Sequence, residues 1–298
     1  MTNFLTRSTM KPQITVGVCV RNAQTTIGET IDSILMQDYG PERVEIIVVD
    51  GNSTDATLTI VRHLLSNARV RWSLYSDEGK GLGYARQSVV NHAQGKYIVF
   101  VDSDVVIRKD FLDEQIAFLN THPRVGVALG RYMYRDGGGL LSSIWNLYLS
   151  AFPGFVGCAF SFRKDAITDA DGFDEKITGA GEEVELIARI QSKAWESAVT
   201  DRAKFYHNHR WTVRNFLSEH TWFGYGGYYA ALKDRHLLSL LRSLPPGQLL
   251  HGLRIAPKIY RSTRRKISFL TVPLLILGSI AWCFGFAQAA THRYGSRQ

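Results

Sequence analysis

The chain has 298 residues, a length that allows one large α/β domain with an appendage or two modest domains. With 45% hydrophobic and 21% charged residues, the composition excludes an intrinsically disordered protein. The net charge of +8 is concentrated in residues 205–266, where eleven Lys and Arg stand against Glu219 and Asp234. A basic segment of this kind suits nucleic acid, an anionic membrane surface or a solvated helix.

From residue 14 to residue 102, strand patterns alternate with helical patterns. The strand patterns are continuous apolar runs at 14–20, 44–50, 70–76 and 96–102. Amphipathic helices are predicted between them, at 25–37, 52–66 and 81–93. This alternation is typical of a mainly parallel, Rossmann-like sheet that is covered by helices on both faces.

After residue 104 the alternation becomes irregular. Helices are predicted at 110–121, 140–152 and 182–194, and strands at 125–134 and 157–165. Beyond residue 211, helical segments rich in aromatic residues and arginine follow. The predicted organisation is an N-terminal tail (1–12), an α/β domain (13–211), basic amphipathic membrane-proximal helices (212–266), a transmembrane helix (267–290) and a tail (291–298).

The segment 267–290 carries no charged residue over 24 positions, which is long enough to span the hydrocarbon core of a bilayer. Cations crowd its N-terminal flank: Lys258, Arg261, Arg264, Arg265 and Lys266. After it come only Arg293 and Arg297. This asymmetry predicts a single-pass protein of the cell membrane with its N-terminal domain in the cytoplasm. The alternative is a buried or interfacial hairpin, broken near Pro273 or Gly278.

Acidic residues follow three of the predicted strands. Asp50 closes the second strand, Asp77 follows the third, and Asp102 and Asp104 close the fourth, in "KYIVFVDSDVVI". Ligands of open α/β sheets bind beyond the carboxyl ends of the strands, and oxygen ligands favour Mg²⁺ or Mn²⁺. The sequence therefore predicts a divalent metal between Asp102 and Asp104. Taken alone, each acidic residue could instead cap a helix or shape a turn.

The ordered motifs "ITVGVCVRNAQTTIGETIDSILMQDYGPERVEIIVVDGNSTDAT", "GKGLGYARQSVVNHAQGKYIVFVDSDV" and "GCAFSFRKD…GFDE…GEEVEL" resemble inverting nucleotide-sugar glycosyltransferases of family 2, with the GT-A fold. The resemblance covers about residues 14–210 and makes the α/β domain the catalytic one. It implies that Asp50 binds the base of the nucleotide and that Asp102 approaches the ribose or the metal, while Asp104 holds the metal. The further donor-binding residues that it implies are Val20, Arg21, Asn22, Lys80 and Arg86.

An inverting transfer requires a general base on the face of the sugar opposite the leaving group. The segment "GAGEEVEL" supplies Glu182 and Glu183 at the start of a helix. The corresponding family motif is usually Glu-Asp with the Asp as base, and Glu183 takes that position, so Glu183 is the first candidate and Glu182 the second. The alternative is ordinary stabilisation of a helix N-terminus by acidic residues.

The segment "FYHNHRW" follows, at 205–211. Family members often have a histidine here that touches the metal or the diphosphate, so His207, with His209 second, is a candidate metal ligand. Processive relatives carry Gln-x-x-Arg-Trp, and this chain has His207-x-x-Arg210-Trp211, which makes Arg210 and Trp211 candidate acceptor residues. The missing Gln and the single membrane helix argue against a polymer-extruding synthase.

Aromatic and basic residues on apolar helices at 220–260 suit the headgroup layer of an anionic leaflet better than nucleic acid. The sequence therefore predicts a UDP- or GDP-sugar as donor and a membrane-associated acceptor, such as a polyprenyl phosphate or a lipid-linked saccharide. Residues 140–155 could form the acceptor wall. The alternatives are a sugar nucleotidyltransferase and a membrane-anchored nucleotide-sugar-binding protein without transfer activity.

Overall fold

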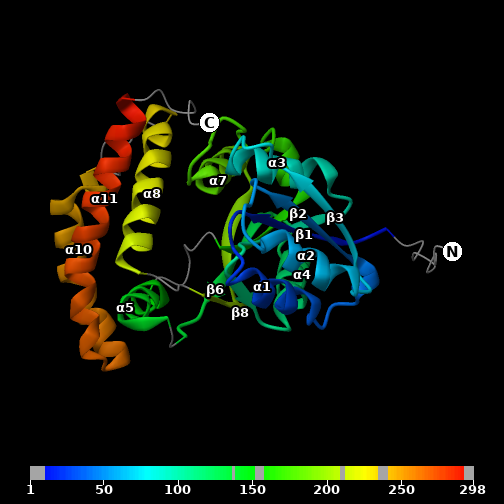
Figure 1. The fold of residues 1–298 in the computed structure, drawn as a ribbon. Helices are drawn as coiled ribbons and strands as arrows, with labels where there is room; N and C mark the ends of the chain where they lie inside the picture. Colours follow the sequence, from blue (N-terminus) through cyan, green and yellow to red (C-terminus); the bar gives the residue numbers. More distant parts are fainter. Residues whose placement is uncertain (1–10, 136–137, 152–157, 209–211, 234–240, 292–298) are drawn as a thin grey trace.

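The computed structural model describes residues 11–135, 138–151, 158–208, 212–233 and 241–291. Within these residues, eight strands form one sheet in the order β3-β2-β1-β4-β7-β6-β8-β5 (Figure 1). The strands are β1 (Ile14–Val20), β2 (Val44–Asp50), β3 (Arg71–Ser76), β4 (Tyr97–Val101), β5 (Val105–Ile107), β6 (Val125–Tyr132), β7 (Ala159–Arg163) and β8 (Glu196–His207).

The two halves of the sheet differ in direction. β3, β2, β1 and β4 are parallel, as the apolar runs predict. β7 is antiparallel to both β4 and β6, and β5 is antiparallel to β8. The predicted α/β sheet covered by helices is confirmed as a mixed sheet, because its second half introduces antiparallel strands.

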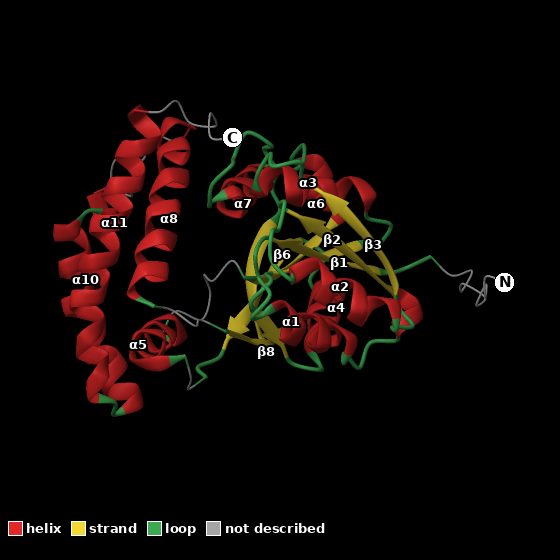
Figure 2. Ribbon diagram, in the orientation of Figure 1, coloured by secondary structure: helices red, strands yellow, loops and turns green. Residues whose placement is uncertain are grey.

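Helices cover both faces of the sheet (Figure 2). One face packs on α1 (Ile27–Leu35), α2 (Thr57–Ser66) and α4 (Phe111–Thr121), and the other on α3 (Leu82–His92), α6 (Lys164–Asp169) and α7 (Glu182–Ser192). Neighbouring strand residues alternate between the two cores: Val48 is buried with α1 and α2, and Val49 with α3. Burial on both faces explains why these strands read as unbroken apolar runs.

Among the described residues, four further helices form a second layer beside the α/β domain. They are α5 (Gly139–Ser150), α8 (Val213–Lys233), α10 (Pro245–Thr263) and α11 (Thr271–Thr291), with the short 3₁₀ helix η2 (Lys266–Leu270) before α11. α11 packs against both α8 and α10, and α5 packs across one end of this bundle (Figure 1). The segment 266–291 is long and apolar enough to cross a membrane, and its mean hydropathy is 2.1. The division into domains and the single crossing remain predictions.

Glycines allow α8 and α11 to approach closely. A Cβ atom on Gly224 of α8 would lie 1.9 Å from the carbonyl oxygen of Trp282, and one on Gly285 of α11 would lie 1.8 Å from that of Thr221. Both neighbours are backbone atoms of a packed helix, so no side chain can rotate away. The two helices must therefore separate if either glycine gains a side chain.

Gly224→Ala is expected to lower the stability of the protein by about 1–3 kcal/mol, because the helices must move apart to admit the methyl group. Gly28→Ala is the matched control, since its Cβ would meet Ile60 at 3.8 Å, an ordinary contact. In α1 the control should stabilise by up to ~1 kcal/mol through helix propensity. Thermal unfolding of both variants in the same detergent measures the difference, and equal midpoints would contradict the close packing.

Candidate active site

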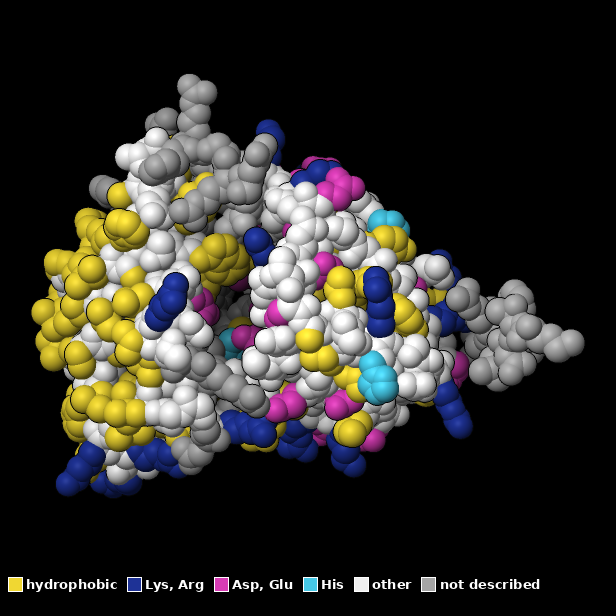
Figure 3. Space-filling model, in the orientation of Figure 1, with side chains coloured by type: hydrophobic (Ala, Val, Ile, Leu, Met, Phe, Trp, Pro, Cys, Tyr) yellow, Lys and Arg dark blue, Asp and Glu magenta, His cyan; other side chains and the backbone are white. Residues whose placement is uncertain are grey.

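The carboxyl ends of β1, β2 and β4 open into one cavity of about 600 Å³. The cavity continues toward the helices α5 and α8, so it lies between the catalytic domain and the helical bundle. Figure 3 shows this hollow in the middle of the molecule, with acidic and histidine side chains inside it. The strand ends at which a ligand site was predicted therefore line a cavity.

The loops that follow β1 and β2 are joined by hydrogen bonds at one end of the cavity, called the donor end because the nucleotide is predicted to bind there. Asn22, with a φ of 51°, accepts a hydrogen bond from the backbone N–H of Thr54 at 2.8 Å. Asp50 is buried and accepts one from the N–H of Ser53 at 3.1 Å. Val20 and Arg21 line the cavity, whereas Asn22 and Asp50 are not among its lining residues.

Asp77 lines this end of the cavity, together with Gly51. Its carboxylate accepts hydrogen bonds from the N–H groups of Gly79 at 2.7 Å and Gly81 at 3.3 Å, which shape the loop after β3. The predicted donor residue Lys80 is outside the cavity lining and pairs with Glu78 at 2.7 Å. Sequence reasoning placed Asp77 at a strand end but gave it no role.

Arg86 is the buried cation beneath the acidic residues. Its guanidinium contacts Asp102 Oδ1 at 3.2 Å and Glu182 Oε1 at 2.6 Å, and it lies about 5 Å from the ring centres of both Phe100 and Phe160. Burial lowers the pKa of Arg86, but the two carboxylates outweigh it and the net shift is upward. Arg86 therefore stays charged and compensates two carboxylates that would otherwise be costly to bury. Arg86 was predicted to face the diphosphate, and it is one of the residues that line the cavity.

Asp102, Asp104 and His207 meet where β4 ends. β5 pairs with the end of β8, which sets Val105 opposite His207 and brings the Nε2 atom of His207 to 3.0 Å from Asp104 Oδ1. Burial raises the pKa of Asp102 to about 7, although Arg86 opposes this shift. Burial also acts to raise the pKa of Asp104, but the charge and hydrogen bond of His207 hold it below its usual value.

The donor atoms at this point fit a divalent cation. Two carboxylates and an imidazole line one cavity, and Mg²⁺ or Mn²⁺ takes its remaining ligands from water and phosphate oxygens. Within the described ranges, no group of three or more His, Cys, Asp or Glu residues is placed so that it could hold a metal ion. A site built from few protein ligands therefore suits a metal that a substrate diphosphate completes.

Glu182 and Glu183 open α7 after Gly181, whose φ is 101°. Glu182 is fully buried against Arg86, while Glu183 is half-buried and lines the cavity. Burial and repulsion from Glu183 raise the pKa of Glu182, and Arg86 opposes them. The 2.6 Å contact with the permanently charged guanidinium of Arg86 favours the ionised carboxylate of Glu182.

Helices α5 and α8 line the other end of the cavity. Its residues there are Trp145, Leu149, Glu219, Trp222 and Phe223. The α5 residues fall within the predicted acceptor wall, and Trp222 was expected in a membrane-proximal helix. Glu219 and Phe223 were missed, although the spacing 219, 222, 223 marks one helical face. His209, Arg210 and Trp211 lie outside the described residues.

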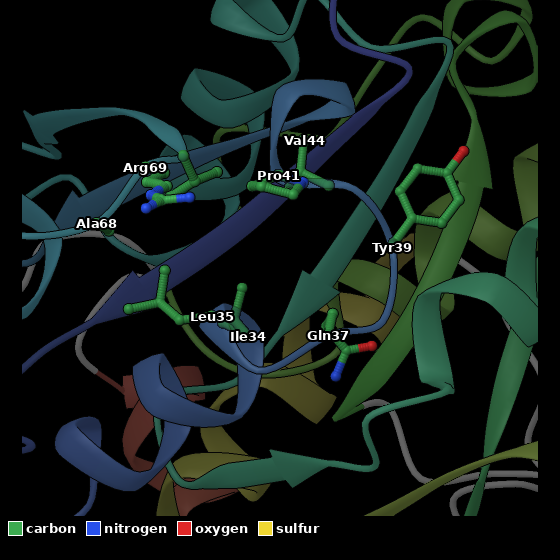
Figure 4. A pocket seen from close by; sticks show the side chains of 9 residues that line it. Ile34, Leu35, Gln37, Tyr39, Pro41, Val44, Ala68 and Arg69 are labelled. Carbon is green, nitrogen blue, oxygen red and sulfur yellow. The ribbon is translucent and has the colours of Figure 1, made fainter. Parts of the chain in front are cut away.

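A second cavity of about 250 Å³ lies between α1, α2 and the start of β2 (Figure 4). Its lining is mostly apolar and consists of Ile34, Leu35, Gln37, Tyr39, Pro41, Val44, Ala68, Arg69 and Val70. It holds no carboxylate, histidine or nucleophile, so it offers no chemistry comparable with the first cavity. The larger cavity is the candidate active site.

The fold and this acidic cavity at the strand ends are those of a nucleotide-sugar glycosyltransferase with the GT-A fold. Residues 15–170 match the family described as Glycosyl transferase family 2, so the chain belongs to that family. The predicted family and enzyme class are confirmed.

Curated glycosyltransferases match about a third of the chain. Poly(ribitol-phosphate) beta-N-acetylglucosaminyltransferase TarS of Staphylococcus aureus is 34% identical over 101 residues, which is 34% of this chain and 18% of TarS. The putative teichuronic acid biosynthesis glycosyltransferase TuaG of Bacillus subtilis is 34% identical over 109 residues, covering 37% of this chain and 42% of TuaG. The matches thus span less than half of these relatives.

Solved structures share the fold over nearly the whole chain. The mannosyltransferase PcManGT from Pyrobaculum calidifontis, in complex with GDP-Man and Mn²⁺, has a TM-score of 0.60 at 21% identity. The alignment covers 95% of this chain and 76% of that one. Residues 1–349 of S. aureus TarS, in complex with UDP-GlcNAc, give a TM-score of 0.55 at 21% identity, covering 97% of this chain and 93% of that one.

Proposed function

We propose that this protein transfers a sugar, with inversion, from a UDP- or GDP-sugar to a membrane-associated acceptor in a metal-assisted reaction. The observation that carries the proposal is that one cavity is lined by Asp102, Asp104 and His207 and also by Glu183. The acceptor hydroxyl that the general base deprotonates must attack the sugar from the face opposite the leaving diphosphate. A single cavity that contains both kinds of residue meets that demand.

The donor end of the cavity supports a nucleoside diphosphate. Val20, Arg21 and Asp77 line it, and Asp50 and Asn22 fix the loops behind. Carboxylates can bind the N–H groups of a base or the hydroxyls of a ribose, so this end offers contacts for a nucleoside. The solved structures with GDP-Man and UDP-GlcNAc favour GDP or UDP without choosing between them.

Asp102, Asp104 and His207 would hold the divalent cation, Mn²⁺ or Mg²⁺. When bound, such an ion supplies positive charge to the departing diphosphate. Arg86 forms ion pairs with both Asp102 and Glu182, so the positions of these carboxylates are set before the donor binds.

Glu183 is the better of the two base candidates. Both residues line the cavity, but Glu183 is half-buried, whereas the side chain of Glu182 is fully buried and paired with Arg86. In this arrangement Glu183 takes the proton of the acceptor hydroxyl as the new glycosidic bond forms. Glu182 instead anchors the start of α7 and so orients Glu183.

The acceptor would enter between α5 and α8, past Trp145, Trp222 and Phe223. Aromatic rings offer a flat apolar surface beside a polar edge, which suits a sugar ring or the first units of a polyprenyl chain. The apolar segment 266–291 would attach the protein to the cell membrane. The cations before it favour a cytoplasmic position for the catalytic domain.

The test is to incubate the purified full chain with a panel of UDP- and GDP-sugars, with Mn²⁺, with Mg²⁺ and with a chelator. Release of the nucleoside diphosphate from one donor, dependent on the metal, is expected. A donor that raises the unfolding temperature but is never cleaved, even with lipid extracts present, would favour a binding protein without transfer activity. Pyrophosphate formation from a sugar 1-phosphate and a nucleoside triphosphate would identify a nucleotidyltransferase.

Trp222→Ala is expected to raise the KM for the acceptor about tenfold, because the variant removes an aromatic wall of the acceptor end. Donor hydrolysis without acceptor should stay within about twofold of the original rate, since donor contacts lie at the other end. Leu232→Ala, on an exposed position of the same helix outside the cavity, is the control. An unchanged KM in Trp222→Ala would contradict the acceptor route.

A further inference from the structure

The two sides of the C-terminal bundle have different surroundings. α8 lies against the catalytic domain, and α10 and α11 pack on its far side as a helical hairpin joined by η2 (Figure 1). One side of the bundle is thus covered by a water-soluble domain, while the other side faces outward. This difference between the two sides restricts the orientations in which the apolar segment 266–291 can bind a membrane.

The catalytic domain contacts the C-terminal half of α8. A Cβ atom on Gly226 would lie 1.9 Å from the carbonyl oxygen of Ala180, just before the turn that carries Glu183. Toward the end of α8, Lys233 Nζ pairs with Asp174 at 2.6 Å and with Glu185 at 2.7 Å. α8 is therefore docked by backbone contact and by ion pairs.

α11 runs beside the same stretch of α8. Gly278 of α11 lies against His220, and Trp282 lies against Gly224 and Gly227. The ring of Phe286 meets that of Tyr228, with centroids 5.3 Å apart. The middle of α11 is consequently level with the part of α8 that lines the active-site cavity.

Because the middle of α11 lies beside the cavity-lining part of α8, α11 cannot stand perpendicular in a bilayer while this packing is kept. A segment of 26 residues, 266–291, is about 39 Å long at ~1.5 Å per residue. If it stood perpendicular in a bilayer, Glu219 and the rim of the active-site cavity would lie near the hydrocarbon centre, together with the domain docked on α8. Charged groups at that depth are costly, and a soluble domain has no place there.

The outward side of the hairpin is apolar. We call it the outer face; its large exposed apolar residues are Leu249, Leu250, Leu253, Phe269, Leu270, Leu277, Ile280 and Phe284. Figure 3 shows hydrophobic side chains gathered over this side of the bundle. An exposed apolar surface that runs across two helices is typical of a membrane or protein interaction site.

Positively charged residues lie at the end of the hairpin that carries the outer face. Arg261, Arg264, Arg265 and Lys266 are exposed at the turn between α10 and α11, and Figure 3 shows Lys and Arg side chains gathered at one end of the bundle. The sequence has no Asp or Glu after Asp234. An apolar surface with cations and without acidic residues complements an anionic lipid leaflet.

We propose that the α10–α11 hairpin lies parallel to the membrane, with its outer face embedded at the headgroup boundary of one anionic leaflet. The inference rests on the membrane attachment in the proposed function, but it is independent of the transfer reaction. It places the acceptor end of the active-site cavity about two helix diameters, ~20 Å, from the lipid surface, since α8 and α11 lie between them. The head group of a lipid-linked acceptor would then extend past α8 to reach Glu183 while its lipid tail stays in the leaflet.

Depth measurements along α11 distinguish this arrangement from a crossing. Leu270→Cys, Leu277→Cys and Phe284→Cys place labels seven residues apart on the outer face, in a chain whose native cysteines are replaced. In vesicles of phosphatidylcholine and phosphatidylglycerol, lipid-borne quenchers should report the same shallow depth at all three positions. A crossing helix would shift the depth by about 10 Å at each step, with the label at 277 deepest, and that profile would overturn the proposal.

Met36→Cys is the matched control for the label, because Met36 is 71% exposed on the catalytic domain. Its label should remain open to a water-soluble quencher in the presence of vesicles. Each labelled variant must retain the thermal unfolding midpoint of the parent chain before its depth is interpreted. No donor or acceptor is needed, so failure of the transfer reaction leaves this result intact.

Vesicle binding by the full chain gives a second test. Leu253→Asp should lower the partition coefficient at least tenfold, while Met36→Asp should leave it unchanged. Omitting phosphatidylglycerol should weaken binding about fivefold for each cation at the membrane. Unchanged binding of Leu253→Asp would overturn the proposal, as would sedimentation of a vesicle-free dimer that the same substitution dissociates. Absence of binding to any vesicle would overturn the membrane attachment as well.

Discussion

Asp104→Ala is expected to lower metal-dependent donor turnover by about 10³-fold, or ~4 kcal/mol. The reason is that the carboxylate of Asp104 is both a proposed metal ligand and the partner of His207 at 3.0 Å. Its loss would leave Asp102 and the imidazole of His207, without its carboxylate partner, to hold the cation. The measurement is the rate of nucleoside diphosphate release at saturating donor over a range of Mn²⁺ concentrations, where the variant should also need more metal for half of its maximal rate.

Asp38→Ala is the control for this loss, since Asp38 is an exposed carboxylate whose cation partner, Lys109, lies 3.8 Å away. It should keep full turnover and an unchanged metal requirement. Thermal unfolding of both variants separates a lost ligand from a lost fold. A folded Asp104→Ala protein with the original metal dependence would contradict the assignment of the metal site.

The first half of the sheet could be predicted because its strands are buried on both faces and therefore read as unbroken apolar runs. The long strand β8 gave no such signal. Its sequence, "ESAVTDRAKFYH", mixes charged and apolar residues, since only part of it is buried. Its pairing with β5 depends on contacts between residues about a hundred positions apart, and no local pattern encodes them.

The candidate site was predictable where local chemistry marked it. Asp102, Asp104 and the Glu182–Glu183 pair stand at element ends, and the structure gathers them around one cavity. The partner of Glu182 was not predictable, because Arg86 reaches it from a helix that begins a hundred residues earlier in the chain. Sequence alone therefore left the two glutamates nearly equivalent, and their burial now separates them.

The role of α8 in the site was missed for a related reason. Glu219, Trp222 and Phe223 share one helical face, but aromatic residues next to an apolar segment also suit a membrane surface. Only the docking of Gly226 on Ala180 turns that face toward the cavity. The helical region assigned to the membrane thus also forms a wall of the candidate active site.

Glu183→Gln is expected to lower kcat by about 10²–10⁴-fold, the usual contribution of a general base. Glutamine keeps the size of the side chain but cannot accept a proton at neutral pH. The affinity for the donor should stay within about threefold, since Glu183 acts on the acceptor rather than the nucleotide. Binding of the donor in the presence of Mn²⁺, measured by calorimetry, and initial rates at saturating donor and acceptor give the two quantities separately.

Glu182→Gln should produce the opposite pattern. It removes the carboxylate at 2.6 Å from a buried guanidinium, so it should destabilise the protein by about 3–5 kcal/mol and lower the unfolding temperature. At temperatures where this variant stays folded, its turnover should exceed that of Glu183→Gln. Glu183→Asp, which restores a carboxylate one methylene shorter, should recover part of the rate. If Glu183→Gln remained active while a folded Glu182→Gln did not, the roles of the two residues would have to be exchanged.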